Sequence, residues 1–252
     1  KMENTWQGKT IGFLGDSITE GIGCEKGKRY WDELERLLGC TSHSYGANGA
    51  VFRDLAGQAD RMHRELGNKV DAISVFAGTN DYNKARPIGS FYTEPVEEKV
   101  IVGYDGEEPR YGTRKHRDLI FDTATFCGSI NFVLGHLRTL YPTKPIYLMT
   151  PIHRAYAKFG GDNIQYDELY ANSGGVFFDE YVETVKKAAN VWACPLIDLN
   201  ALCGLYPRND THAALFFANE STDRLHPSAG GHKRMAQAIA HALRAVSPYD
   251  HE

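Results

Sequence analysis

The amino-acid sequence predicts an α/β protein in which a parallel β-sheet lies between two layers of helices. Short β-branched or apolar runs alternate with longer segments of helical periodicity along the 252 residues, as in successive βαβ units. Hydrophobic residues make up 42% of the chain and charged residues 24%, the balance of an ordinary globular protein, and the sequence holds no internal repeat. We therefore expect one α/β domain that spans residues 1–252.

Five strands and five helices account for this alternation. The strands are expected at the short apolar runs, which cover residues 10–15, 41–45, 72–77, 145–150 and 196–199. The helices are expected at residues 30–38, 55–66, 123–141, 176–189 and 230–246. In the last of these segments, one apolar stripe at three- and four-residue spacing is formed by Met235, Ile239, Leu243 and Val246. The order of elements predicts a five-stranded parallel sheet in a three-layer α/β/α arrangement.

The connections that leave the third, fourth and fifth expected strands are long. They cover residues of about 80–118, 151–175 and 200–228. In an open parallel sheet these exits share the carboxyl edge, where ligands bind, so we expect the functional site there. Inside the first connection, an apolar run at residues 100–104 precedes Asp105-Gly106 and predicts a small hairpin.

Charge and cysteine content exclude several classes of protein. The chain has 28 Lys+Arg and 32 Asp+Glu, a net charge of −4, whereas a surface for nucleic acid or anionic membrane needs many cations to neutralise phosphates. The five cysteines include no Cys-x-x-Cys, so neither a disulfide framework nor a zinc site is expected. No apolar run approaches the roughly 18 residues of a membrane span. We expect no metal, no cofactor and a small or uncharged substrate.

The cellular location and the oligomeric state stay open at this stage. The chain begins Lys1-Met2-Glu3, and because a Lys ahead of the Met is not a natural start, a signal peptide would already be missing. We expect a secreted or periplasmic location, with a cytoplasmic one as the alternative.

A serine stands at the exit of the first expected strand. Gly15 runs directly into Asp16-Ser17, so Ser17 lies on the ligand edge of the predicted sheet. The triplet alone is a weak signal, because Asp and Ser also favour the N-cap of a helix. A serine hydroxyl becomes a nucleophile only when a base removes its proton, so a catalytic Ser17 requires a histidine with an orienting carboxylate.

Two Asp-x-x-His segments could supply that pair. Asp60 and His63 fall within the amphipathic pattern of residues 55–66, where three-residue spacing merely puts both on one solvated helix face. Asp223 and His226 follow the fifth strand, and Pro227 disfavours a helix at His226, so we expect this pair in a loop before a helix that starts at residue 228 or 229. The second pair is the better candidate.

Donors for an oxyanion hole are expected on the same edge. Asn80 follows the third strand and offers a carboxamide, and the glycine-rich segment 46–50 after the second strand lets the backbone approach a substrate closely. A nucleophile, a backbone donor, a side-chain donor and an acid-base pair thus each follow a different strand. Taken singly, each of these segments is more typical of an ordinary turn.

These segments resemble the motifs of the serine hydrolase superfamily known as SGNH or GDSL hydrolases. The resemblance extends from residue 10 to about 246, and the motifs that carry it are Gly15-Asp16-Ser17-Ile18-Thr19, Gly46-Ala47-Asn48-Gly49, Gly78-Thr79-Asn80-Asp81 and Asp223-Arg224-Leu225-His226. The resemblance implies a flavodoxin-like fold with strand order 2-1-3-4-5. It also implies roles for five residues: nucleophile Ser17, base His226, its partner Asp223, and oxyanion donors Gly49 and Asn80.

The sequence departs from the motifs of this superfamily in two places. Ile18 stands where the name GDSL has Leu, a change that conserves side-chain volume. The second motif keeps its glycine spacing but has loose flanks, which leaves the choice of Gly49 rather than Gly46 as the less secure assignment.

The function expected from these residues is that of a metal-independent serine esterase that works through an acyl-enzyme. One alternative is a thioesterase or lysophospholipase with the same residues and an apolar acyl groove. A second alternative is a catalytically silent carbohydrate-binding relative, which the presence of Ser17, Asn80, Asp223 and His226 argues against.

The long connections indicate the substrate. They are rich in aromatic and polar side chains, whereas a groove for a long acyl chain should show runs of Leu, Ile, Val and Met. Rings beside hydrogen-bonding groups suit a sugar, so we expect a short-chain esterase and most plausibly a deacetylase of O-acetylated carbohydrate. Tyr82 and His153 are the candidate substrate contacts. The alternative is that these segments form ordinary solvated surface or a subunit interface.

Overall fold

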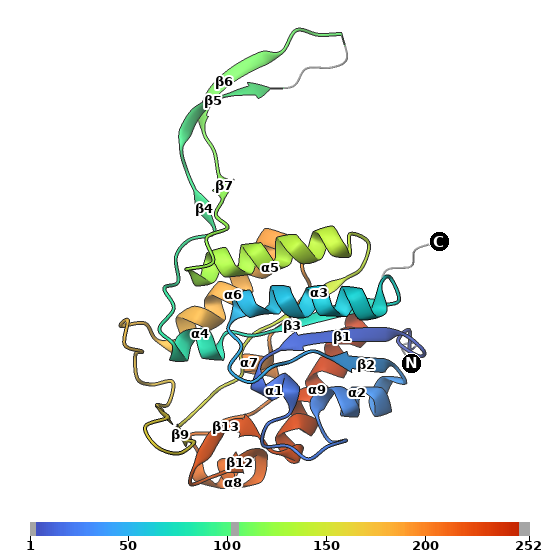
Figure 1. Cartoon of the computed structure of the whole chain (residues 1–252), viewed down its shortest axis with the longest axis vertical. Coiled ribbons are helices and arrows are strands. Elements are labelled where there is room, and N and C mark those ends of the chain that lie inside the picture. The colour runs from blue at the N-terminus through green and yellow to red at the C-terminus, as the bar shows by residue number, and fades with distance from the viewer. Residues whose placement is uncertain (1–3, 102–105, 247–252) are drawn as a thin grey trace.

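The computed structural model describes residues 4–101 and 106–246 and confirms the predicted α/β class (Figure 1). Five parallel strands form the central sheet in the order β2-β1-β3-β8-β11, which is the order 2-1-3-4-5 along the chain. The strands of this sheet are β1 (Thr10–Gly15), β2 (Thr41–Ser44), β3 (Ala72–Phe76), β8 (Ile146–Met149) and β11 (Leu196–Ile197).

Helices cover both faces of the sheet. One layer consists of α3 (Leu55–Leu66), α5 (Phe126–Leu140) and α6 (Phe178–Trp192), and the other contains α2 (Tyr30–Leu38) and α9 (Ala229–Ala245) (Figure 1). Helices α2 and α3 begin and end at the predicted residues.

The strands contribute alternate side chains to two hydrophobic cores. Phe13 of β1 packs in the core beneath α2 and α9, whereas Leu14 packs in the core beneath α3, α5 and α6. Because β1 and β3 are buried on both faces, their sequences read as nearly continuous apolar runs. Each fully buried Phe or Leu side chain contributes about 1.5–3 kcal/mol to the free energy of unfolding.

The first long connection forms a projecting hairpin. After α4 (Thr79–Asn83), β5 (Val96–Ile101) pairs antiparallel with β6 (Arg110–Lys115), and below them the short strand β4 (Tyr92–Thr93) pairs with β7 (Asp118–Leu119). This arm extends away from the helical layer (Figure 1). The predicted hairpin is therefore present but longer than expected, and of its predicted turn, Asp105-Gly106, only Gly106 lies within the described residues.

The other two long connections meet in a second sheet that the sequence did not predict. Its four antiparallel strands follow the order β10-β9-β13-β12. Their bounds are β9 (Ala157–Lys158), β10 (Ile164–Gln165), β12 (Phe217–Asn219) and β13 (Asp223–Pro227). Three further short helices complete the fold: α1 (Ser17–Glu20), α7 (Leu199–Leu202) and α8 (Asp210–Phe216).

The expectation of a loop at His226 was wrong, because residues 223–227 are strand β13. This strand pairs with β12 and, through Asp223 and Ala157, with β9, a partner far away in the sequence. Pro227 is the last residue of the strand, where a missing N–H disturbs the pairing least. The helix after it does start as predicted, since α9 begins at Ala229 and Ser228 caps it through the Gly231 N–H.

The five cysteines are free thiols, and Cys40, Cys127, Cys194 and Cys203 are buried as small hydrophobic side chains. Among residues 4–101 and 106–246, no helix is both long enough and apolar enough to cross a bilayer.

Candidate active site

Three side chains form a hydrogen-bonded chain at the carboxyl edge of the central sheet. His226 Nε2 lies 2.9 Å from Ser17 Oγ, and His226 Nδ1 lies 2.8 Å from Asp223 Oδ2. Ser17 is 4% exposed and His226 is 5% exposed. Because the Asp223 carboxylate can only accept, Nδ1 carries the proton of a neutral imidazole and Nε2 is left to accept the Ser17 hydroxyl proton.

The Asp223 carboxylate is fixed by three donors. Its Oδ1 accepts hydrogen bonds of 3.0 Å from the backbone N–H groups of Leu225 and His226, while its Oδ2 accepts from the His226 ring. These bonds orient the carboxylate toward the imidazole. The loop that we expected for this pair is thus replaced by strand β13. The side chain of its first residue, Asp223, folds back onto the backbone of the same strand.

Ser17 owes its position to the abrupt passage from β1 into α1. Asp16 is the N-cap of α1, and its Oδ1 accepts from the Ile18 N–H at 3.0 Å. The capping role that the sequence allowed for either residue therefore falls to Asp16, and the Ser17 hydroxyl faces His226. Burial raises the pKa of Asp16 to about 6, although the Ile18 hydrogen bond and nearby His226 oppose the rise.

The competing Asp-x-x-His pair lies elsewhere on the surface of α3. Asp60 Oδ1 is 2.6 Å from Nε2 of His136 in α5, and the His63 ring packs edge-on against Tyr141. Each side chain of this pair has a partner in the α3–α5 layer, in agreement with the structural interpretation of this motif.

The predicted oxyanion donors Asn80 and Gly49 lie in the segments that follow β3 and β2. The Nδ2 of Asn80, in α4, donates to the Ala50 carbonyl at 2.9 Å, which leaves its second hydrogen available. Among the hydrogen bonds of the described residues, none uses the backbone N–H of Ser17 or of Gly49. Gly49 has φ +79°, a conformation that favours glycine.

Gly46 has a packing role instead. A Cβ atom at Gly46 would lie 2.7 Å from the Glu20 nitrogen and from Thr19 Cβ, and 2.8 Å from the Asp16 carbonyl oxygen. These neighbours belong to α1 and its cap, so a glycine is needed where the loop after β2 passes beside Ser17. The assignment of Gly49 as a donor stays a prediction.

The neighbour of Asn80 helps to hold this loop. Asp81 is fully buried, and its Oδ2 accepts from the Phe52 N–H at 3.0 Å while Oδ1 lies 3.5 Å from Arg86 Nε. Burial raises the pKa of Asp81 to about 7, against the effects of the Phe52 hydrogen bond and of Arg86. Asn80 and Asp81 thus attach the segment on either side of Val51 to α4.

A buried arginine that the sequence analysis did not identify holds α4 through hydrogen bonds to Thr79. Arg154 is 1% exposed, and its guanidinium donates to Thr79 Oγ1 at 2.9 Å, to the Thr79 carbonyl at 3.1 Å and to Gln165 Oε1 at 2.9 Å. Burial lowers the pKa of Arg154 to about 10, so the side chain stays charged at neutral pH. The only sequence signal for this role was the position of Arg154 in the connection that follows β8. That signal was insufficient because most arginines in loops are exposed.

An aromatic side chain that the sequence analysis also missed covers the histidine. The ring of Phe159, from the turn between β9 and β10, lies 5.4 Å from the His226 ring at an angle of 57°. Phe159 itself is partly exposed. The Phe159 ring shields from water the side of the imidazole that it contacts.

The two predicted substrate contacts have different surroundings. Tyr82 is buried, and its hydroxyl donates to the Tyr170 carbonyl at 2.5 Å and to the Asp167 carbonyl at 3.2 Å. This placement favours a structural role that anchors the 167–170 segment over the predicted substrate contact. His153 is half-buried in a cavity of about 230 Å³, with Nδ1 2.6 Å from Glu168 Oε1.

One group of metal-ligand type lies on the arm. His116 Nε2 is 3.1 Å from Glu97 and Nδ1 is 3.6 Å from Asp118. The two carboxylates thus face different nitrogens of the ring.

Comparisons with known proteins agree with this fold. The model of the GDSL-like Lipase/Acylhydrolase family matches residues 13–234. The chain is similar to the solved structure of a protein from Lactobacillus plantarum, with 24% identity over 96% of this chain and 99% of that chain and a TM-score of 0.70.

Two further solved structures are similar over comparable lengths. One is described as a possible lipase from Chitinophaga pinensis, with 23% identity, 94% and 98% of the two chains covered and a TM-score of 0.65. The other is an acetyl xylan esterase, AlAXEase, with 18% identity, 93% and 99% covered and a TM-score of 0.57. None of the curated proteins matches the chain significantly.

The packing around Gly46 predicts a pair of contrasting glycine variants. Gly46→Ala should lower the free energy of unfolding by about 1–3 kcal/mol, because the new methyl group meets backbone that cannot move aside. Gly57→Ala, in α3, should leave it unchanged or raise it by up to about 1 kcal/mol, because a Cβ there meets nothing within 4 Å. Urea unfolding measures both, and equal stability of the two variants would contradict the close approach at Gly46.

Proposed function

This chain belongs to the GDSL-like lipase/acylhydrolase family and is a carboxylic ester hydrolase, and we propose that it acts as a serine esterase with Ser17 as nucleophile. The observation that carries the proposal is the continuous hydrogen-bonded chain from Asp223 through His226 to Ser17. His226 acts as general base and Asp223 holds it in the tautomer that can accept the serine proton. The oxyanion donors are the N–H groups of Ser17 and Gly49 and the Asn80 carboxamide.

The reaction proceeds in two halves. Ser17 Oγ attacks the ester carbonyl as His226 Nε2 takes the hydroxyl proton, and the carbonyl oxygen becomes an oxyanion. The tetrahedral intermediate collapses as His226 returns the proton to the leaving alcohol, which gives an acyl-enzyme. Water then attacks the acyl carbonyl as His226 takes its proton, and the second tetrahedral intermediate collapses as His226 returns that proton to Ser17 Oγ, which releases the acid and free Ser17.

The oxyanion donors are preorganised by the loop contacts around α4. Asn80 is already held by the Ala50 carbonyl, so its free hydrogen needs no reordering when charge develops. A fixed donor of this kind typically accounts for about 10²–10³ in kcat. The Arg154 charge, which bonds to Thr79 next to Asn80, adds positive potential on the same side.

The two Asp-x-x-His pairs provide the test of the triad. His226→Ala should lower the esterase rate constant kcat/KM toward p-nitrophenyl acetate by about 10³-fold or more, because the nucleophile loses its base. His63→Ala is the matched control and should stay within a few-fold of the wild type, since its ring packs on Tyr141. Steady-state assays on the two purified variants measure kcat/KM. Similar losses in both variants would contradict the assignment of His226 as the base.

For the substrate, we propose a short acyl group on a carbohydrate, most plausibly an acetyl ester. Exposed aromatic rings gather in the connections at the carboxyl edge, among them Tyr156, Tyr166, Tyr170 and Tyr206. Such rings pack against the apolar face of a sugar while neighbouring polar groups meet its hydroxyls. The structural likeness to an acetyl xylan esterase supports the same substrate class. The alternatives are a thioesterase or lysophospholipase, which use the same triad, and a catalytically silent carbohydrate-binding relative.

A substrate series separates these functions. Among p-nitrophenyl esters we expect the acetate to be hydrolysed with the highest catalytic efficiency and the efficiency to fall toward the dodecanoate, and we expect acetate to be released from acetylated xylan or pectin fragments. We expect long chains to react more slowly because the larger cavity at the edge, of about 900 Å³, is lined mainly by polar and charged side chains, which do not repay burial of each CH₂. A rate that climbs beyond octanoate, with no acetate from any glycan, would favour the lipid or thioester alternative, and no turnover of any ester would favour the silent one.

A further inference from the structure

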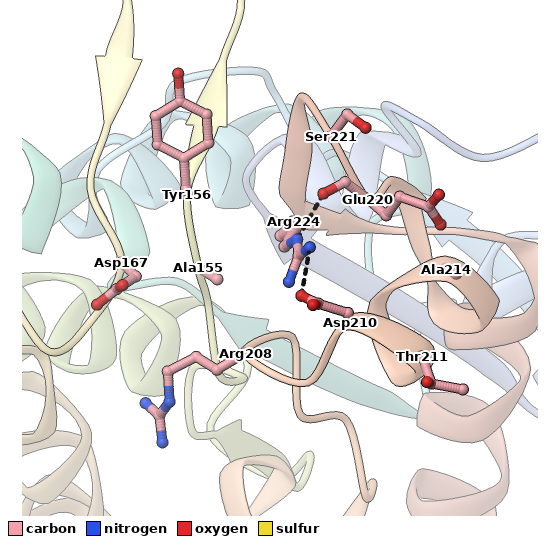
Figure 2. A pocket seen from close by; sticks show the side chains of 10 residues that line it. All are labelled: Ala155, Tyr156, Asp167, Arg208, Asp210, Thr211, Ala214, Glu220, Ser221 and Arg224. Carbon is pink, nitrogen blue, oxygen red and sulfur yellow. Dashed lines mark hydrogen bonds and ion pairs between the residues drawn. The ribbon is translucent and has the colours of Figure 1, made fainter.

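Two cavities lie next to each other at the carboxyl edge and share one lining residue. The larger, of about 900 Å³, is drawn in Figure 2 and includes Tyr156, Asp167 and Arg208 in its wall. The smaller, of about 230 Å³, includes His153 and Phe177 and also Arg208. Asp167 lines the first and the next residue, Glu168, lines the second, so the two cavities adjoin at Arg208 and at this segment. We call the two cavities together the edge groove.

The edge groove lies beside β13, the strand that carries His226. Arg224 lines the groove and stands between Asp223 and Leu225 in this strand. The opposite wall is built from the segment before β9, where the Arg224 N–H donates to the Tyr156 carbonyl at 3.1 Å. In Figure 2, Tyr156 and Asp167 stand on one side of the groove and Asp210, Thr211 and Glu220 on the other.

The Arg224 charge in this groove is already used within the protein. Its Nη2 lies 2.9 Å from Asp210 Oδ1, its Nη1 donates to the Pro207 carbonyl at 3.1 Å, and its Nε donates to the Glu220 carbonyl at 2.6 Å. Each nitrogen of the guanidinium therefore has a protein partner, and the Asp210 carboxylate balances the Arg224 charge.

Arg208 is held in a similar way. Its Nη1 forms an ion pair with the buried Glu168 carboxylate, and its Nη2 donates to the Tyr206 hydroxyl at 2.8 Å. Glu168 is further bonded to His153 Nδ1. The carboxylates of Asp167 and Glu220 also line the groove, and since a carboxylate can accept about four hydrogen bonds, the single bond from the Leu169 N–H leaves Asp167 able to accept more.

Aromatic rings flank the groove on this wall and at the junction of the cavities. Tyr156 is partly exposed and projects from the groove wall (Figure 2). Tyr206 is also exposed. Its ring contacts Arg208, which lines both cavities, and His153, which lines the smaller one. Rings that present an apolar face beside hydrogen-bond acceptors match a ligand with many hydroxyl donors and an apolar ring face.

We propose that the edge groove binds the chain of an uncharged oligosaccharide whose acyl ester is presented to Ser17. This inference rests on the esterase function proposed above and narrows its substrate to neutral rather than acidic glycans. The two adjoining cavities, of about 900 Å³ and 230 Å³, accommodate several sugar units, with Tyr156 as a stacking surface and Asp167 and Glu220 as acceptors for hydroxyl groups. An acidic glycan is disfavoured because Asp210 and Glu168 balance the two guanidinium charges, whereas Asp167 and Glu220 keep accepting capacity and repel anions.

Binding to the Ser17→Ala variant tests the groove without any chemistry. Isothermal titration calorimetry should detect xylohexaose or cellohexaose and should show about tenfold or more weaker binding of hexagalacturonate, because each added carboxylate meets Asp167 and Glu220. Adding Tyr156→Ala should weaken binding of the neutral chain by about three- to tenfold, the size of one lost aromatic contact. Adding Tyr111→Ala, an exposed tyrosine on the arm, should leave the Kd unchanged.

A charge-removing variant tests the selectivity. Asp167→Asn with Glu220→Gln keeps the shape of both side chains and should bring hexagalacturonate closer to the neutral chains in affinity, while melting temperatures verify that all variants fold. The groove is rejected if neither neutral chain binds, if Tyr156→Ala and Tyr111→Ala behave alike, or if the acidic chain binds best.

The esterase proposal is tested separately by acetate release from acetylated xylo-oligosaccharides with the wild type. Binding of the neutral chain without release of acetate would support the groove and reject the deacetylase. Release of acetate with no effect of Tyr156→Ala on binding would support the deacetylase and reject the groove.

Discussion

The hydrogen bond between His226 Nε2 and Ser17 Oγ joins two residues that are 209 positions apart in the chain. It forms only if β1 delivers Ser17 to the carboxyl edge of the central sheet and β13 delivers His226 to the same place. The second sheet provides this constraint, because β13 is held between β12 and β9. A small antiparallel sheet therefore sets the geometry of a site that lies at the edge of the large parallel one. Phe159, from the same small sheet, then covers the imidazole.

The proposed oxyanion side of the site depends on the short helix α4. This helix is too short to be stable by itself, and its residues are held by tertiary contacts instead. Asn80 and Asp81 bond to the backbone of the loop after β2, and Arg154 bonds to Thr79 from below. Buried charges of this kind are costly unless their hydrogen bonds are satisfied, so these contacts must form together.

Local patterns explain what could be predicted from the sequence. Helices α2 and α3 and strand β1 were predicted to the residue, because each has a clear apolar pattern and a turn or glycine directly after it, such as Gly39 after α2. Ser17, Asp223 and His226 could be proposed as one site because polar groups at successive strand ends converge on one edge in any open parallel sheet.

Strand β13 escaped prediction because it is short and polar and because its partner β9 lies about 66 positions earlier in the sequence. The burial of Arg154 and Tyr82 depends on tertiary contacts that composition does not encode. Counting aromatic residues in a loop likewise does not tell which rings face inward, which is why Tyr82 and Tyr156 could not be told apart.

The central claim is that Ser17 is the nucleophile of this ester hydrolase, and covalent labelling tests it most directly. Incubation with an aryl phosphonate, followed by peptide mass spectrometry, should place a single adduct on the peptide that contains Ser17. The adduct and the esterase activity should both be lost in Ser17→Ala. An adduct on another residue, or a Ser17→Ala variant that keeps most of its turnover, would contradict the account.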